Sequence, residues 1–112
     1  MSTSTIQEIE LNIQQAKKIV DLGDAMTRLL SNRDFKKIFL EGYFKDEAVR
    51  LVHLKADFNM QEPERQANLI RMMDAIGITE QYCRTITMQA DMANKAMQAD
   101  EETRDELLAA GE

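Results

Sequence analysis

Residues 5–31 read TIQEIELNIQQAKKIVDLGDAMTRLLS, and their apolar side chains recur in steps of three and four. The first stripe consists of Ile6, Ile9, Ile13, Ala16 and Val20. This spacing is typical of an amphipathic helix and compatible with a coiled-coil seam. A second, adjacent stripe consists of Ile19, Leu22, Met26 and Leu29. We therefore expect one long helix whose apolar face is wider than a single partner helix covers.

The ends and the interior of this helix carry further signals. Thr5 with Glu8 three residues later is a capping-box pattern, which predicts the start of the helix. Gly23 inside the helix is unfavourable by about 1 kcal/mol relative to alanine. We expect it to mark either a close helix crossing or a bend.

The next segment predicts a stop and a restart. Asn32 suits a left-handed helix end, and Asp34 can cap the helix that follows. Gly42 predicts the end of that helix, and a further helix is expected over residues 45–56. The alternative is an uninterrupted helix over residues 34–56.

The second half of the chain begins with a connection at residues 57–61 and with Pro63, which favours a first helical turn. Gly77 allows a break, after which Thr79 would cap another helix. Alternatively, the helix continues through Gly77, because apolar residues keep the same rhythm on both sides. Asp100 is expected to cap a final short helix over residues 101–109.

Composition supports an all-helical chain. The 112 residues are 44% hydrophobic and include four glycines and one proline, too few for the many turns of a sandwich or barrel. We expect an all-α fold of four to five helices, with a long N-terminal helix packed against a long C-terminal helical half. Helix content should exceed about 65%, against a base rate near one third. Residues 1–99 would form the helical bundle domain, and residues 100–112 an acidic C-terminal segment.

The charge is unevenly distributed. Residues 100–112 contain six acidic and one basic residue and so carry −5 of the chain's net −6, whereas residues 28–55 contain seven basic and four acidic residues. Opposite charges of this kind can attract, within one chain or between neighbours. The candidate basic surface is Arg33, Lys36 and Lys37, and Leu107 and Leu108 could add apolar contacts. The simpler interpretation is a solvated tail, or one packed on its own bundle.

Methionine is unusually frequent in the second half, with six of the eight between residues 60 and 97. Met88 and Met92 are four residues apart and share a helix face. Methionine fills irregular gaps in cores and also serves adaptable contact surfaces. Core packing is the commoner role, and a surface that faces a partner is the alternative.

No pattern indicates an active site, and we expect neither an enzyme nor a cofactor or metal site. The chain has one histidine, His53, and one cysteine, Cys83, and it lacks the clustered ligands that metals need. It also lacks a glycine-rich phosphate loop. The net acidic charge disfavours nucleic-acid binding, and no apolar run is long enough for a membrane partner or a signal peptide.

Four segments resemble a family of small helical proteins of tailed bacteriophages. They are RDFKK (33–37), LEGYFKDEAVRLVHLKAD (40–57), AIG (75–77) and DEETRDELL (100–108). The family is often encoded among virion and head-assembly genes and has no settled activity. The resemblance therefore implies a viral origin and a role in particle assembly or structure, but it transfers no functional residue.

These observations together predict a non-enzymatic bacteriophage protein that acts through helix–helix contacts. Its partner would be a second copy, in a homo-oligomer, or a portal or capsid protein, in the host bacterial cytoplasm during infection or in the virion. The alternative is a small acidic phage protein that binds and inhibits a host protein. The residues expected to bind partners are Ile6, Ile9, Ile13, Val20, Arg33, Lys36, Lys37, Met88, Met92, Leu107 and Leu108.

Overall fold

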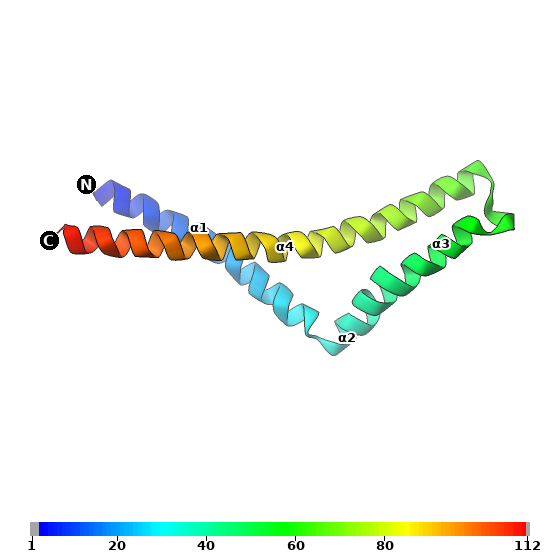
Figure 1. Ribbon diagram of the computed structural model, residues 1–112, viewed down its shortest axis with the longest axis horizontal. Helices are drawn as coiled ribbons and strands as arrows, with labels where there is room; N and C mark the ends of the chain where they lie inside the picture. The colour runs from blue at the N-terminus through cyan, green and yellow to red at the C-terminus, as the bar shows by residue number, and fades with distance from the viewer. Residues whose placement is uncertain (1–2, 112) are drawn as a thin grey trace. The chain divides into compact units, whose positions relative to one another are not determined.

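The computed structural model describes residues 3–111 and is 94% helical, with no strand in that part of the chain. Its elements are α1 (Thr3–Leu30), α2 (Arg33–Phe35), the π-helix η1 (Lys36–Glu47), α3 (Ala48–Ala56), the 3₁₀-helix η2 (Phe58–Met60) and α4 (Pro63–Ala110) (Figure 1). The all-α prediction is confirmed. The predicted number of four to five helices is wrong, because three long helical stretches, 3–30, 33–56 and 63–110, account for nearly all of the fold.

The chain divides into two compact units. Unit 1 comprises residues 1–27 and 85–112, and unit 2 comprises residues 28–84. Each unit therefore has about 55 residues. Domains of about 60 residues bury only about 60% of the surface that their unfolded chain exposes, so units of this size gain little from their cores.

Unit 1 is an antiparallel pair of helices formed by α1 and the C-terminal part of α4, with the start of α1 and the end of α4 at the same end of the pair (Figure 1). Met26, Ile86 and Ala93 are its buried apolar side chains. A Cβ atom added to Gly23 would lie 2.1 Å from the Cβ atom of Ala90. Gly23 therefore marks a close helix crossing, one of its two predicted roles.

The helix of residues 33–56 is capped by Asn32, not by Asp34. Asn32 has extended backbone angles, φ −72° and ψ 129°, and its side-chain oxygen accepts hydrogen bonds from the backbone N–H groups of Asp34 and Phe35 at 3.0 and 2.9 Å. The predicted left-handed Asn32 and capping Asp34 are therefore both wrong. Asn32 is the better cap because its amide oxygen reaches both of these N–H groups.

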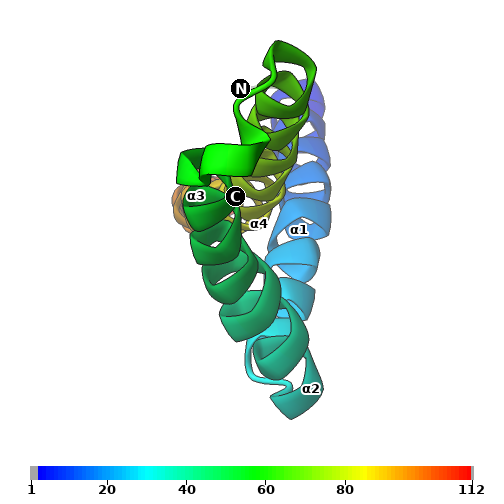
Figure 2. The ribbon, with the colours of Figure 1, turned by 90° about the vertical axis from the view of Figure 1, so that its right-hand side faces the viewer.

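Helical structure then continues without a break through α2, η1 and α3, as Figure 2 shows. The uninterrupted alternative is thus confirmed, and the predicted helix end at Gly42 is wrong. Residues 36–47 are a π-helix, a form that is rare and usually confined to a single turn. Aromatic rings contact one another along it. The ring centroid of Phe39 lies 5.0 Å from that of Phe35, in a stacked arrangement. It lies 6.2 Å from that of Tyr43 and 6.3 Å from that of Phe44, both edge-on.

The core of unit 2 joins α3 to the N-terminal part of α4. Leu51 is fully buried, and Leu69 and Ile76 are nearly so. Half-buried side chains pack around these three: Tyr43, Phe44, Ala48, Leu54, Met60 and Met73. The π-helix η1 therefore contributes Tyr43 and Phe44 to the core. Ile38, in the same helix, remains 61% exposed.

α4 is a single helix, so the predicted break at Gly77 and the predicted helix start at Asp100 are wrong. Thr79 does not act as a cap, because its hydroxyl donates a hydrogen bond to the carbonyl oxygen of Ala75 at 2.7 Å, four residues earlier. Ser and Thr inside helices commonly bond in this way. The continuous alternative is confirmed, and residues 100–110 extend α4.

Candidate protein-interaction surfaces

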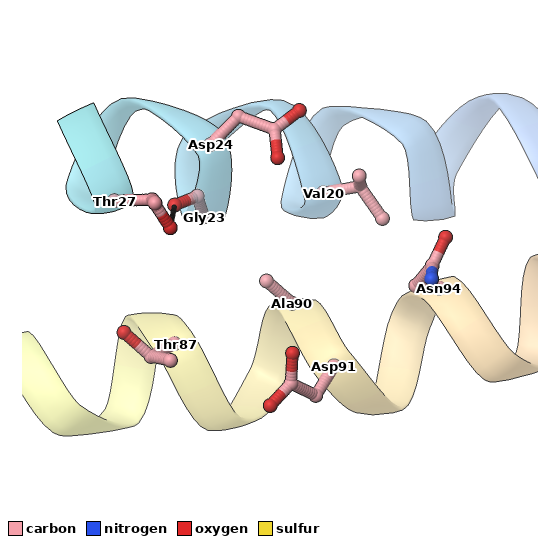
Figure 3. A pocket seen from close by; sticks show the side chains of 8 residues that line it. All are labelled: Val20, Gly23, Asp24, Thr27, Thr87, Ala90, Asp91 and Asn94. Atoms are coloured by element: carbon pink, nitrogen blue, oxygen red, sulfur yellow. Dashed lines mark hydrogen bonds between the residues drawn. The ribbon is translucent and has the colours of Figure 1, made fainter.

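The predicted N-terminal seam lies on the inner side of the helix pair in unit 1. Val20 lines the space between α1 and α4 (Figure 3). Ile13 and Ile6 precede it by seven and fourteen residues and so share its side of α1, which Ile9 also adjoins. All four side chains are half-buried. They are therefore contacts within unit 1 that one partner helix leaves partly open to water.

Other apolar side chains of unit 1 are largely exposed. We call them the outer apolar residues: Leu11 (54% exposed), Ile19 (41%), Leu22 (52%), Met88 (58%) and Met92 (66%). Leu11 and Leu22 are eleven residues apart, about three turns, and therefore lie on one side of α1. The core role considered for Met88 and Met92 does not hold, because both side chains lie on the surface.

A polar groove accompanies the helix crossing in unit 1. Its lining comprises Val20, Gly23, Asp24, Thr27, Thr87, Ala90, Asp91 and Asn94 (Figure 3). The Thr27 hydroxyl donates a hydrogen bond to the Gly23 carbonyl oxygen at 3.1 Å. Two carboxylates alone make a weak cation site, and no group of three or more potential metal ligands occurs among residues 3–111.

The predicted basic surface in unit 2 is a shallow hollow, which we call the basic hollow. It is lined by Ser31, Arg33, Lys36, Lys37 and Glu41. The structure thus brings the three predicted cations together, and all three side chains are exposed. Glu41 supplies one negative charge at its edge, so the hollow keeps an excess of positive charge.

The acidic C-terminal residues form the last turns of α4. Leu107 is half-buried, whereas Leu108 is 48% exposed. The structure therefore separates the two predicted leucines: one faces inward and the other outward. Arg104, the single base of this segment, lies 3.3 Å from the carboxylate of Asp105.

The most exposed aromatic residue of the described chain was not among the predicted contacts. Phe58, in the connection between α3 and α4, is 89% exposed. Sequence reasoning treated residues 57–61 only as a loop. The available signal was a large apolar residue between two turn-forming ones, Asp57 and Asn59.

Side-chain hydrogen bonds hold this connection firmly. The Gln61 amide donates to the carbonyl oxygens of Lys55 and Asp57 at 3.0 and 2.7 Å. The Gln66 amide donates to those of Lys55 and Met60, both at 2.9 Å. The Asp57 carboxylate accepts from the Asn59 N–H at 2.7 Å. Phe58 is therefore presented to solvent by a preorganised loop.

One surface ion pair of the described chain shifts the pKa values of both its members. Arg50 donates two hydrogen bonds to Glu47, at 2.6 and 2.8 Å. The hydrogen bonds from Arg50 lower the pKa of Glu47, and the same contacts raise the pKa of Arg50. His53 is exposed and Cys83 half-buried. The Glu47–Arg50 pair lies where η1 passes into α3, so it supports the helix there.

None of the helices, as far as they are described, has the length and apolar character needed to cross a membrane. The candidate contact surfaces are therefore the outer apolar residues, the basic hollow, the acidic end of α4 and Phe58.

Comparisons of the chain with protein-family models, with curated proteins and with solved structures find no match.

Proposed function

We propose that this protein is a non-enzymatic assembly protein that associates with further copies of itself through helix–helix contacts. The proposal rests on the exposure of the outer apolar residues of unit 1. In a unit of about 55 residues, the described apolar side chains that are buried are Met26, Ile86 and Ala93, while the five outer apolar residues and Leu108 are 41–66% exposed. A second copy can cover what one antiparallel helix pair leaves open, as in four-helix bundles.

The viral part of the proposal is supported by the sequence resemblance described above. It assigns the assembly role to a bacteriophage particle, with a portal or capsid protein as a further partner. Mass spectrometry of purified particles tests this directly. Tens of copies per particle are expected, and absence from particles would contradict a role as a virion component.

A second candidate function, binding and inhibition of a host protein, is favoured by Phe58. Aromatic anchors in preorganised segments often dominate protein interfaces because they fill a pocket on the partner with little loss of entropy. The same particle analysis separates the two candidates, since a host-directed inhibitor would be absent from the virion.

Self-association through the outer apolar residues is tested with the double variant Leu11→Gln, Leu22→Gln. Both positions are exposed, so the change should alter the stability of a single chain by only about 0.5 kcal/mol or less. Light scattering is expected to show a smaller particle mass than for the wild type at equal concentration. Lys17→Gln, an exposed change on the same helix, is the control and should leave the mass unchanged.

The opposite result would be a double variant with unchanged mass and unchanged helical circular dichroism. In that case the outer apolar residues do not form the contact. Loss of helical signal in the variant would instead show that these leucines stabilise the fold itself, and would also contradict their assignment to an interface.

A further inference from the structure

We propose that the basic hollow of one molecule binds the acidic end of α4 from a second copy. This inference rests on the proposed self-association and adds to it a specific polar contact. Both surfaces of this contact belong to the chain itself: the basic hollow lies in unit 2 and the acidic end of α4 in unit 1.

The basic hollow is built on a fixed helix start. The cap at Asn32 holds the first turn, which carries Arg33, and the stacked rings of Phe35 and Phe39 follow it. Within residues 3–111 no ion pair involves Arg33, Lys36 or Lys37. Three neighbouring cations therefore lie exposed, with Glu41 as the one carboxylate lining the hollow.

The acidic end of α4 has the complementary charge on one side of the helix. Asp105 and Glu106 follow Glu102 by three and four residues, so the three side chains form a continuous outward face. All three are exposed, while Leu107 on another side is half-buried. Glu102 and Glu106 form no ion pair in the described chain. Like charges four residues apart destabilise a helix slightly, and cations of a partner relieve that repulsion.

A second copy is the occupant because the two surfaces carry opposite charges and every copy presents both. The acidic end is held in unit 1, paired with α1, whereas the basic hollow is part of unit 2. Every copy carries both surfaces, so the same contact can form between all copies in an assembly. Reciprocal exchange would close a two-fold dimer, and head-to-tail exchange would give rings or filaments.

The test exchanges the charges in full-length protein. One variant is Lys36→Glu, Lys37→Glu, and the other is Glu102→Lys, Glu106→Lys. Each alone is expected to weaken self-association about tenfold, since each removes two exposed ion pairs and adds repulsion. An equimolar mixture should recover most of the wild-type affinity, because the reversed hollow of one variant fits the reversed helix of the other.

The matched control is Lys45→Glu, Lys55→Glu, which makes the same charge change at two exposed lysines outside the basic hollow. It should leave association within a few-fold of the wild type, by the small size of exposed charge effects. Equal weakening in the control, or no recovery on mixing, would overturn the proposal. A contact within one chain could not be restored by mixing, so recovery also identifies the second copy.

Two further outcomes separate this proposal from its alternatives. If the wild type is monomeric at every concentration, the proposed self-association itself fails. If the wild type associates but Lys36→Glu, Lys37→Glu changes only the binding of a short DNA duplex, the basic hollow serves nucleic acid and the contact proposed here is wrong.

Discussion

Gly23 is the residue on which the helix crossing of unit 1 depends most directly. A β-carbon at this position would lie 2.1 Å from that of Ala90, far inside van der Waals contact. The two backbones can therefore approach each other only if residue 23 has no side chain. Gly77, on α4, has no atom within 4 Å of an added β-carbon.

These two glycines give a matched prediction. Gly23→Ala is expected to destabilise the protein by about 1–3 kcal/mol, because overpacking forces the helices apart. Gly77→Ala should stabilise it by up to about 1 kcal/mol, because alanine is the better helix former and meets open space. Urea unfolding followed by circular dichroism measures both. A stabilising Gly23→Ala would contradict the close crossing.

Leu51 and Phe58 are large apolar residues with opposite surroundings. Leu51 is fully buried between α3 and α4, whereas Phe58 is 89% exposed. We expect Leu51→Ala to lower the free energy of unfolding by about 2–5 kcal/mol through the cavity it leaves. Phe58→Ser should change it by about 0.5 kcal/mol or less. If thermal unfolding showed a similar loss of stability in both variants, Phe58 would be a core residue and not a contact residue.

At the scale of elements, the helix of residues 33–56 changes from π to α geometry beside the Glu47–Arg50 pair. The hydrogen bonds from Arg50 lower the pKa of Glu47 below its ordinary 4.5. A carboxylate with a lowered folded-state pKa contributes stability above its unfolded pKa. That contribution is lost as the pH falls from about 4.5 through the lowered value.

Arg50→Gln should therefore return the pKa of Glu47 towards 4.5. The NMR titration of the Glu47 side-chain carboxyl measures it, with Arg84→Gln, a change at another exposed arginine, as control. The stability difference between Arg50→Gln and the wild type should shrink at pH values below the lowered pKa. An unchanged Glu47 titration would show that the two side chains are not paired in solution.

Sequence periodicity predicted the long α1, the continuity of α4 as one alternative and the close crossing as one role of Gly23. It failed where single residues were taken as stops. Gly42 and Gly77 each disfavour a helix by only about 1 kcal/mol, less than the packing of the residues around them provides. Asp100 is a good cap but is also tolerated inside a helix, where its side chain is half-buried. The π-helix was unpredictable from templates with 3.6 residues per turn.

Candidate surfaces were predictable to a similar degree. The clustering of Arg33, Lys36 and Lys37 followed from their spacing at a helix start. The inward position of Leu107 and the outward position of Leu108 did not, because the C-terminal segment was taken as separate from α4. Phe58 was missed because loop composition does not show whether side-chain hydrogen bonds, such as those of Gln61 and Gln66, fix the loop.

At the scale of the whole molecule, the chain combines small cores with large exposed apolar side chains. Six apolar residues are buried among those described, three in each unit. Proteins are stable by a small margin, and burying further apolar surface on association would add to it. Stability should therefore rise with protein concentration, which a melting temperature measured over a range of concentrations would reveal.

Whether the protein self-associates is measured by sedimentation equilibrium of the full-length wild type at micromolar concentrations. We predict a mass that rises with concentration to a multiple of the 12.9 kDa chain. A mass of 12.9 kDa throughout the concentration range would show that the protein is a monomer and does not self-associate.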